Sequence, residues 1–359
     1  MLPDMRGGGA ERVALRLIGD FLKAGHEVDL VLLQEIGELL PLLPSEVRVF
    51  DLGARRVRSG IWPLVRYLRQ RRPHAMQISM WPLTAIGILA HRLARSRARI
   101  VTSDHAALSK HYPPSKPLTY RSLTWSVRLF YPLADARILV AKDAADDLAR
   151  ISGIDRGTIE VVYNPVGEPP ENVGTTREIE MLWGDADQRI ITVGTFKAQK
   201  NHQLLVRSFA SAFRGATVKL MILGEGELRF GLEALARELG VAEQVLLPGF
   251  TTDPWPYYAS ADLFALSSNY EGYPLVLIEA LRSGLPIVST DCESGPREIL
   301  DDGRFGELVP VGDEAALAEA MKSALARPHD TAALRARAEA LSGQATSDRY
   351  LELMLGEPI

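Results

Sequence analysis

The chain has 359 residues, of which 47% are hydrophobic and 24% charged, and its formal net charge is −4. This length exceeds one ordinary domain and fits two, and the composition is typical of a soluble globular protein. The longest apolar run, at about 80–90, contains Pro82 and is shorter than a membrane span. Cys292 is the only cysteine, which excludes an intrachain disulfide and favours the cytoplasm.

Positive charge gathers in the first half of the chain. Residues 1–170 carry 24 Lys and Arg against 17 Asp and Glu, a balance of +7, whereas the remainder has a balance of −11. The densest cluster comprises Arg55, Arg56, Arg58, Arg66, Arg69, Arg71 and Arg72, interspersed with Ile61, Trp62, Pro63, Leu64, Val65 and Leu68. This segment is either a solvated surface helix or a patch that contacts an anionic membrane at the inner face. No nucleic-acid-binding module accompanies the charge, so nucleic acid is not an expected partner.

Strand-like and helix-like segments alternate along this half, a pattern that predicts parallel sheets flanked by helices. The first helix is expected over 11–24, because Val13, Leu17 and Phe21 recur at helical spacing and Gly25 follows as a helix-ending residue. Strands are expected at about 27–33, 47–52, 75–80, 99–103, 137–141 and 159–163.

The pattern is interrupted at 164–170, where Pro165, Gly167, Pro169 and Pro170 break regular structure. We expect a first domain over 1–164 and a linker over 165–188. Strands then resume at about 189–194, 218–224, 244–248, 261–266, 286–290 and 307–309. Two α/β halves joined by one linker create a cleft, and ligands of such sheets bind at the carboxyl ends of the strands facing it.

The segment 267–280 combines a strand end, a loop and a helix start. Its polar and turn-forming residues are Glu271, Gly272, Tyr273, Pro274 and Glu279, and the helix begins near Leu275 and Val276. Backbone N–H groups at a helix N-terminus, together with the helix dipole, suit a diphosphate. Glu279 is then placed to accept hydrogen bonds from ribose hydroxyls and Glu271 to face a sugar. The alternative is that both glutamates lie on the surface.

This segment resembles the E-x7-E motif of glycosyltransferase family 4, whose members are retaining enzymes with the GT-B fold. Similar stretches elsewhere include Gly7-Gly8-Gly9-Ala10-Glu11-Arg12-Val13, Asn164-Pro165-Val166, Val193-Gly194-Thr195, Lys200-Asn201-His202, Gly224-Glu225-Gly226, 284–291 and 294–300. The resemblance implies an α/β protein with two Rossmann-like domains facing a central cleft. The first would be the acceptor-side domain, 189–340 the nucleotide-sugar-binding domain, and 341–359 a helix crossing back to the first.

The resemblance also implies roles for individual residues in the second domain. Glu271 would hold the hydroxyls of the donor sugar, Glu279 the ribose, and Lys200 would neutralise the diphosphate leaving group. Thr195 stands where the family usually has an arginine, which leaves the second phosphate cation open; Lys197 is a candidate. Phe250 follows Gly249 at a strand end, where the family holds the nucleotide base, and the alternative is a buried core phenylalanine.

In the first domain, the glycine loop and one histidine match family positions. Gly8 and Gly9, with Gly7, would let the backbone approach the diphosphate or the acceptor closely, or else form a tight turn before the first helix. His105 follows a predicted strand end, and the resemblance implies that it contacts the donor sugar and the reaction centre. A structural role is the alternative for a lone histidine.

No cofactor or metal is expected. Asp185 and Asp187 imitate the metal-binding D-x-D of a different glycosyltransferase fold, but they lie in the predicted linker, where a polar turn is the favoured interpretation. The zinc, P-loop and metalloprotease patterns are absent. Arg229 occupies the third-glycine position after Gly224 and Gly226, which disfavours a dehydrogenase.

The sequence therefore predicts a retaining glycosyltransferase that moves a sugar from a nucleotide-diphosphate donor, UDP-linked, to a lipid-linked saccharide or polysaccharide. The alternatives are a nucleotide-sugar epimerase of the same fold and a non-catalytic sugar-nucleotide-binding subunit. Only Met1–Arg6 precede the glycine loop, where the family has its first strand. We accordingly expect an apolar strand upstream of Met1, the alternative being that Met1–Pro3 form a short stub.

Overall fold

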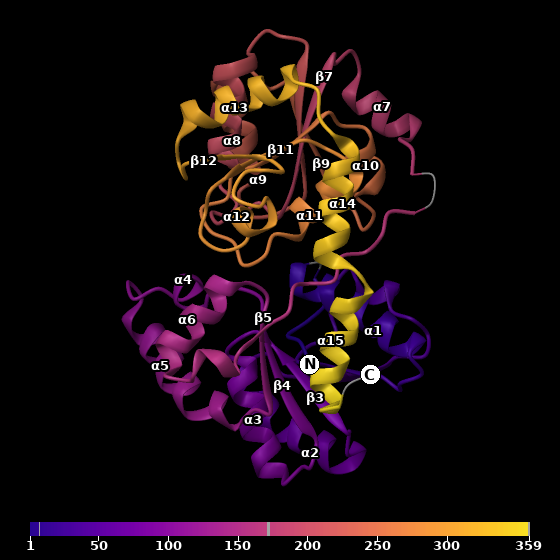
Figure 1. Ribbon diagram of the computed structural model, residues 1–359, viewed down its shortest axis with the longest axis vertical. Coiled ribbons are helices and arrows are strands. Elements are labelled where there is room, and N and C mark those ends of the chain that lie inside the picture. The colour runs from indigo at the N-terminus through magenta and orange to yellow at the C-terminus, as the bar shows by residue number, and fades with distance from the viewer. Residues whose placement is uncertain (7, 171–172, 358–359) are drawn as a thin grey trace. The chain divides into compact units, whose positions relative to one another are not determined.

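A computed structural model describes residues 1–6, 8–170 and 173–357, and Gly7 of the predicted glycine loop lies outside these ranges. The chain divides into two compact units (Figure 1). Unit 1 comprises Met1–Pro165 and Ser342–Ile359, and unit 2 comprises Val166–Leu341. Both are α/β units built on parallel strands.

Unit 1 contains six strands, each at a position that the sequence predicts. They are β1 (Asp29–Leu32), β2 (Arg48–Asp51), β3 (Ala75–Ser79), β4 (Arg99–Asp104), β5 (Ala136–Leu139) and β6 (Glu160–Val161). Its helices within the described ranges are α1 (Gly9–Lys23), α2 (Ile61–Arg71), α3 (Leu83–Ala94), α4 (Leu108–His111), α5 (Pro117–Phe130), α6 (Lys142–Ser152) and α15 (Gln344–Leu355), with short 3-10 turns η1 (Leu40–Leu42), η2 (Val57–Gly60), η3 (Tyr131–Leu133) and η4 (Arg156–Thr158). Helix α1 thus begins at Gly9, two residues before the predicted start.

The first two residues connect the two sheets of unit 1, which have strand orders β1-β2 and β3-β4-β5-β6. The Leu2 amide donates to the Val31 carbonyl at 3.0 Å, and Leu2 pairs with Leu32 in a parallel bridge. On the other side the amide of Ser79 donates to the Met1 carbonyl at 3.1 Å. Met1 and Leu2 therefore form a stub between β1 and β3, and burial lowers the pKa of the terminal amine to about 5. The expectation of residues upstream of Met1 stays a prediction.

Unit 2 contains six strands at the predicted positions in one parallel sheet. They are β7 (Gln188–Val193), β8 (Val218–Leu223), β9 (Val245–Gly249), β10 (Leu263–Leu266), β11 (Ile287–Thr290) and β12 (Glu307–Val309). The helices are α7 (Arg177–Trp183), α8 (His202–Phe213), α9 (Arg229–Glu238), α10 (Trp255–Ala259), α11 (Leu275–Ser283), α12 (Pro296–Ile299), α13 (Glu314–Ala326) and α14 (Thr331–Ser342). The strand order is β12-β11-β10-β7-β8-β9. The chain therefore runs outward from β7 to β9 and then returns to the other side of β7 at β10.

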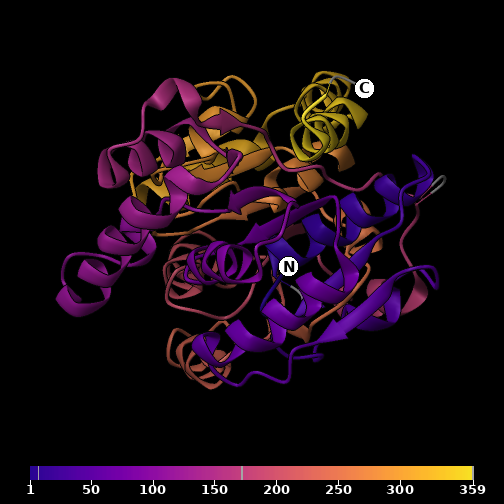
Figure 2. The same ribbon diagram turned by 90° about the horizontal axis from the view of Figure 1, so that it is seen from below.

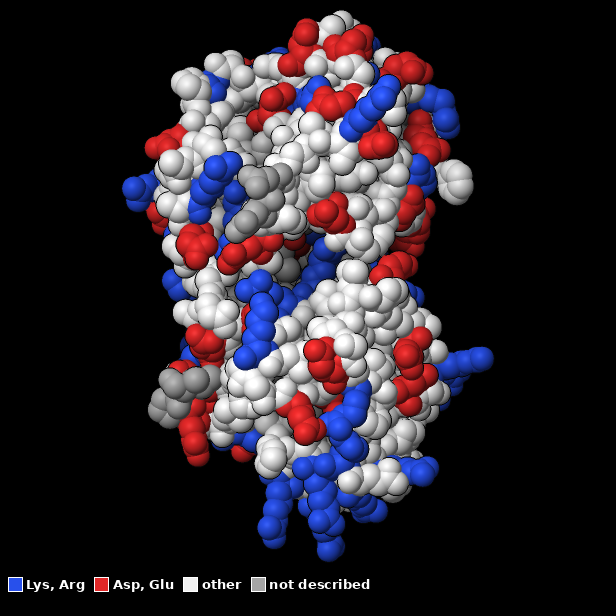
Figure 3. Space-filling view, turned by 90° about the vertical axis from the view of Figure 1, so that its right-hand side faces the viewer, with Lys and Arg blue, Asp and Glu red and all other residues white. Residues whose placement is uncertain are grey.

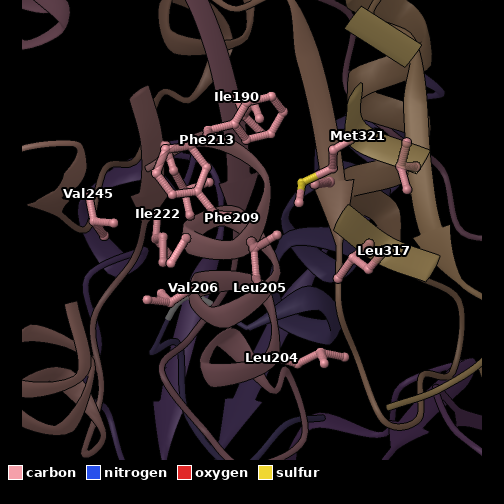
Figure 4. Packing of buried hydrophobic residues seen from close by; sticks show 14 of the residues in the cluster. Ile190, Leu204, Leu205, Val206, Phe209, Phe213, Ile222, Val245, Leu317 and Met321 are labelled. Carbon is pink, nitrogen blue, oxygen red and sulfur yellow. The ribbon is translucent and has the colours of Figure 1, made fainter. Parts of the chain in front are cut away.

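The core of unit 2 joins this sheet to α8 and α13. Figure 4 shows Phe209 and Phe213 of α8 beside Ile190 and Ile222 of the sheet, with Met321 of α13 nearby. All five side chains are buried, and each fully buried large apolar side chain contributes about 1.5–3 kcal/mol to folding. This packing fixes the sheet whose carboxyl edge carries the loops described below.

The predicted linker and the final helix are each part of one of the two units. The predicted linker, 165–188, contains α7, and its Trp183 is buried in unit 2 with Nε1 donating to Ser260 Oγ at 2.8 Å. Helix α15 belongs to unit 1, where Ser347 Oγ donates to Asp20 at 2.6 Å and Arg99 Nε donates to the Leu353 carbonyl at 2.8 Å. The final helix is therefore a structural part of unit 1.

The arginine-rich segment forms α2 and the turn before it, at the end of unit 1 where Figure 3 shows Lys and Arg side chains gathering. Its apolar residues Leu64, Val65 and Leu68 are buried, whereas the seven arginines are exposed. Arg71 pairs with Asp29 at 3.1 Å. This is the arrangement of a solvated surface helix packed on its own core. In the part of the chain that the structure describes, no helix is long and apolar enough to cross a membrane.

Candidate donor-binding site

The candidate site in unit 2 lies where the sheet changes direction. Strands β7 and β10 are neighbours in the sheet. The chain leads from β7 to β8 on one side of this pair and from β10 to β11 on the other side. The loops after these strands lie at the carboxyl edge of the sheet, at the switch point where open α/β sheets place a ligand-binding crevice. Lys200 lies on the loop after β7 and Glu271 on the loop after β10.

The two loops carry an ion pair. Lys200 Nζ lies 2.7 Å from Glu271 Oε1, and the two side chains are 16% and 6% exposed. Ser268 Oγ donates to the same oxygen at 2.5 Å, and Gln199 Nε2 lies 3.5 Å from Glu271 Oε2. These contacts hold a cation and a carboxylate side by side at the crevice, a pair that can bind a phosphate and a hydroxyl group respectively.

The environment of this pair keeps other titratable groups neutral. Burial, and next the positive charge of Lys200, lower the pKa of His202 to about 3. Burial, and next the negative charge of Glu271, raise the pKa of the Cys292 thiol to about 12. At neutral pH both side chains are therefore uncharged, so the charges at this point are those of Lys200 and Glu271 themselves.

Hydrogen bonds to backbone carbonyls connect the loop after β7 with the loop after β10. The amide of Asn269 donates to the Gln199 carbonyl at 2.8 Å, and Ser267 Oγ donates to the Lys200 carbonyl at 3.0 Å. Asn201 caps the N-terminus of α8 from the left-handed region, with φ of 47°, and its side chain accepts a hydrogen bond from the Leu204 amide. Asparagine tolerates this conformation and caps helices, so the sequence itself shapes the turn that presents Lys200.

Glycines allow the neighbouring loop to approach closely. Gly224, at φ of 148°, would bring an added Cβ within 2.2 Å of the Gly194 carbonyl oxygen, and Gly226 would meet the backbone of Phe196 at 2.7 Å. Neither position accepts a side chain without displacing backbone. The loop after β8 therefore lies against the loop after β7, beside Lys200.

Helix α11 begins directly behind Glu271. Leu275 is its first residue, so Pro274 occupies the capping position before it rather than the first turn. Its first N–H groups, including those of Leu275 and Val276, have no acceptor within the helix, because helix geometry leaves the initial amides unpaired. Gly272, Tyr273 and Pro274 are buried and lead the chain to this point. Helix α11 thus presents its positive end at the crevice.

Glu279 lies one turn inside α11 and is held from the side. Tyr258 of α10 is fully buried, and its hydroxyl donates to Glu279 Oε2 at 2.8 Å. Glu279 itself is 8% exposed. The alternative that both glutamates of the motif lie on the surface is wrong, because Glu271 and Glu279 are both buried and hydrogen-bonded.

Three other residues that the sequence analysis named follow strands of the unit 2 sheet, at its carboxyl edge. Thr195 follows β7 and is half-buried, and Lys197 is exposed. Phe250 follows β9 and is 40% exposed, so it is not a core residue. Glu225 and Arg229, from the Gly224–Gly226 region, form an ion pair with each other.

The predicted residues of unit 1 lie at the carboxyl edge of its own sheet. Gly8 caps α1, where an added Cβ would meet Glu11 Oε2 at 2.4 Å, and Gly9 is the first helical residue. His105 directly follows β4, with Nε2 3.4 Å from Ser103 Oγ. Burial lowers the pKa of His105 to about 4, and a hydrogen bond with Asn164 acts in the opposite direction.

Sequence reasoning did not identify the side chains that hold these groups in place. In unit 1, Asp104 accepts hydrogen bonds from the Trp81 amide at 3.0 Å and from the Tyr131 hydroxyl at 2.7 Å. Burial raises the pKa of Asp104 to about 6. In unit 2 the missed residues are Ser268 and Tyr258. The serine sits three positions before Glu271 and was visible in the motif, whereas the tyrosine is twenty-one residues from Glu279 and carries no local signal.

The aspartates that imitate a metal site have structural partners. Asp185 pairs with Lys219 at 3.3 Å, and Asp187 accepts a hydrogen bond from Thr217. Over the described residues, no group of three or more His, Cys, Asp or Glu side chains is arranged to hold a metal ion. The absence of a metal requirement stays a prediction.

Comparisons with known proteins bear on the family. Residues 180–341 match the model of glycosyl transferases group 1, and residues 7–167 match that of Glycosyltransferase Family 4. The chain belongs to the family 4 glycosyltransferases, which have the GT-B fold. In this glycosyltransferase the residues described in unit 2, including Lys200, Glu271 and Glu279, fall within the region matched by the group 1 model, and Gly8, Gly9 and His105 fall within the other.

Curated relatives of the chain are named as glycosyltransferases. One, from Campylobacter jejuni, is N-acetylgalactosamine-N,N'-diacetylbacillosaminyl-diphospho-undecaprenol 4-alpha-N-acetylgalactosaminyltransferase; it is 34% identical over 66% of this chain and 63% of its own length. Another, the amylovoran biosynthesis glycosyltransferase AmsD of Erwinia amylovora, is 27% identical over 82% of this chain and 81% of its own. The match to the first therefore spans less than two thirds of that relative.

Solved structures share the fold at low identity. HepE of Anabaena in complex with UDP-glucose has a TM-score of 0.80 at 18% identity, covering 99% of this chain and 98% of its own. The lipopolysaccharide outer core galactosyltransferase WaaB has a TM-score of 0.73 at 20% identity, covering 99% of both chains. These similarities establish the GT-B fold of this glycosyltransferase.

Proposed function

We propose that this protein is a retaining glycosyltransferase that transfers a sugar from a UDP-linked donor to a lipid-linked saccharide or polysaccharide. The observation that carries the proposal is the Lys200–Glu271 pair at 2.7 Å beside the start of α11. It joins a cation, a carboxylate and a helix N-terminus at the switch point of one sheet. A nucleotide-diphosphate sugar needs partners of these three kinds.

The diphosphate is assigned to Lys200 and the first amides of α11. Cleavage of the sugar–phosphate bond builds negative charge on the leaving diphosphate, and a fixed cation stabilises this charge most in the transition state. The helix dipole adds partial positive charge at the same point. Thr195 supplies no charge there, so Lys200 carries this part of the catalysis in the proposal.

The sugar and the nucleoside are assigned to the other residues. Glu271, with Gly272 and Tyr273, holds hydroxyls of the donor sugar, and Glu279 accepts hydrogen bonds from the ribose. Phe250 marks the base-binding end, consistent with its exposed ring at the end of β9. Gly8, Gly9 and His105 belong to unit 1, and their roles toward the diphosphate and the sugar rest on the family resemblance.

The proposed donor and acceptor are supported by the relatives. Solved neighbours contain UDP or UDP-glucose, and a curated relative acts on a diphospho-undecaprenol-linked saccharide. We propose that the reaction proceeds without a metal and in the cytoplasm, at the inner membrane face, because a lipid-linked acceptor resides in a membrane.

Incubation of the purified protein with a panel of nucleotide sugars and a lipid-linked saccharide as acceptor tests the reaction class. A transferase releases free UDP and forms a glycoside, whereas an epimerase leaves the nucleotide attached to the sugar. A non-catalytic subunit binds the donor, which stabilises the fold by about 2.7 kcal/mol at a hundred times the dissociation constant, but releases no UDP. Release of UDP without acceptor-dependent glycoside would contradict the proposal.

A further inference from the structure

Helix α5 of unit 1 exposes an apolar stripe that the core does not use. Leu118 is 83% exposed, Trp125 64% and Leu129 48%. These positions are seven and four residues apart, which places them on one face of a helix. Leu123, Ser126 and Val127 are buried on the opposite face. Figures 1 and 2 show α5 on the outer side of unit 1.

The surroundings of this stripe are basic. Between Asp104 and Asp135 the sequence contains Lys110, Lys116, Arg121 and Arg128 and no Asp or Glu. Arg121 and Arg128 are exposed and, with Trp125 and Leu129, line a shallow surface depression. On the neighbouring helix α6, Asp143 is exposed next to the exposed Lys142, and Asp146 and Asp147 form ion pairs with Arg156 and Arg150. The charge beside the apolar stripe is therefore positive.

Helix α2 carries the arginine cluster that the sequence analysis gave as a candidate membrane-contacting patch. It differs from α5 in the exposure of its apolar side chains. It carries more arginines, but its apolar side chains Leu64, Val65 and Leu68 are buried, and Trp62 alone among its large apolar residues is exposed. A helix that exposes charge but no apolar area is attracted to an anionic membrane only weakly and in a salt-sensitive way. An amphipathic helix binds more strongly because it also buries its apolar face in the membrane. Helix α5 has both components.

We propose that α5 is the membrane-docking element of this protein and that its occupant is the surface of an anionic bilayer. Leu118, Trp125 and Leu129 enter the boundary between headgroups and acyl chains, and Arg121 and Arg128 contact lipid phosphates. Tryptophan is enriched at this depth because its ring is apolar and its N–H is polar. The inference extends the proposed function, since docking brings the enzyme to a lipid-linked acceptor.

Vesicle flotation tests this proposal on the full-length protein. Vesicles of phosphatidylcholine with about a third phosphatidylglycerol should bind the wild type, and pure phosphatidylcholine should bind it weakly. Arg121→Gln should reduce the partition coefficient about fivefold, the effect of one basic residue near the surface, and Trp125→Ser by roughly tenfold or more. Salt should reverse the arginine effect but only part of the tryptophan effect.

The matched control lies on α2. Trp62→Ser with Arg66→Gln removes the same residue types from an exposed helix of the same unit, and binding should be retained within about twofold. Brominated lipids should quench tryptophan fluorescence in the wild type, and Trp125→Phe should abolish that quenching while preserving most of the binding. Thermal unfolding confirms that each variant is folded.

Two outcomes would overturn the proposal. One is binding that survives in Trp125→Ser and Arg121→Gln but is lost in the α2 control. The other is no binding to anionic vesicles, which would leave the apolar stripe to a protein partner. Calorimetric titration with UDP on the same preparations reports on unit 2 separately, so the donor-site proposal stands or fails independently of docking.

Discussion

The two glutamates of the 271–279 motif are eight residues apart, but they are held in different ways. Glu271 lies on a loop and balances a positive charge, Lys200, at 2.7 Å. Glu279 lies inside α11 and is held by a neutral donor, the Tyr258 hydroxyl, at 2.8 Å. One carboxylate is therefore coupled to the charge of the proposed diphosphate site, whereas the other accepts a hydrogen bond from a buried tyrosine of α10.

This difference predicts a division of labour. Interactions that strengthen as the bond breaks raise turnover, whereas interactions that are constant through the reaction contribute to binding. In the proposal, the Lys200–Glu271 pair lies next to the bond that is broken, and the Tyr258–Glu279 pair lies next to the ribose. Substitutions in the first pair should lower turnover, and substitutions in the second pair should weaken nucleotide affinity.

The largest expected effect follows Lys200→Ala. Turnover should fall by about 10²-fold or more, the scale for loss of one transition-state charge contact. The substitution also removes the positive charge beside Glu271, while Ser268 and Gln199 still donate hydrogen bonds to its carboxylate. Steady-state kinetics with the best donor measures the loss. Lys219→Ala, which removes an ion-paired lysine from β8 in the same unit, is the control and should retain turnover. Wild-type turnover in folded Lys200→Ala protein would refute the assignment.

Ser268→Ala should have an intermediate effect. It removes the hydrogen bond to Glu271 Oε1 while leaving the ion pair, and hydrogen bonds to charged groups contribute about 1.5–3 kcal/mol. Turnover should therefore fall roughly tenfold, with UDP affinity nearly unchanged. Ser289→Ala removes another fully buried serine, on β11, and serves as the control. A selective loss of UDP affinity in Ser268→Ala would contradict the division.

Tyr258→Phe tests the contribution of the Tyr258–Glu279 pair to nucleotide affinity. Without the hydroxyl, Glu279 loses a hydrogen bond to a charged group, a kind that contributes about 1.5–3 kcal/mol, so the dissociation constant for UDP should rise about tenfold. Turnover at saturating donor should change little. Tyr257→Phe, at the neighbouring position of α10, is the matched control. A drop in turnover at unchanged affinity would place Glu279 with the reacting sugar instead.

The smallest expected effect is that of pH on the histidines. The pKa of His105 is lowered to about 4 and that of His202 to about 3, so both are neutral above pH 5. The rate should show no histidine-like inflection near the ordinary value of about 6.5. Asp104, whose pKa is raised to about 6, titrates in this range. An inflection that His105→Asn removes and Asp104→Asn retains would contradict the expectation.

Much of the fold is predictable from the sequence because it depends on local patterns. Alternating apolar segments locate the strands of both sheets, and the E-x7-E segment locates the start of α11. Gly9 was assigned to a loop but begins α1, and α7 was hidden in the predicted linker, because short helices carry little periodicity. The donors to Glu271 and Glu279 differ in the same way: Ser268 lies within the motif, whereas Tyr258 meets Glu279 only through the packing of α10 on α11.

The outward face of α5 was not predicted for a related reason. Leu118, Trp125 and Leu129 are apolar, so a sequence pattern by itself assigns them to a core. Only the structure shows that α5 packs on the core through Leu123 and Val127 and leaves the other apolar residues exposed. Conversely, the apolar residues of α2 lie among arginines but are buried. Charge is visible in the sequence, whereas the direction of an apolar face is decided by packing.

Calorimetric titration with UDP tests the central claim most directly. UDP lacks the sugar, so it reports on the diphosphate and ribose contacts without the contacts of Glu271 to sugar. The account predicts that Glu279→Ala weakens UDP binding about tenfold or more, the effect of losing charged hydrogen bonds, while Glu271→Ala binds UDP close to the wild-type value but transfers sugar poorly. Equal loss of UDP affinity in the two folded variants would contradict the separate roles assigned to the two glutamates.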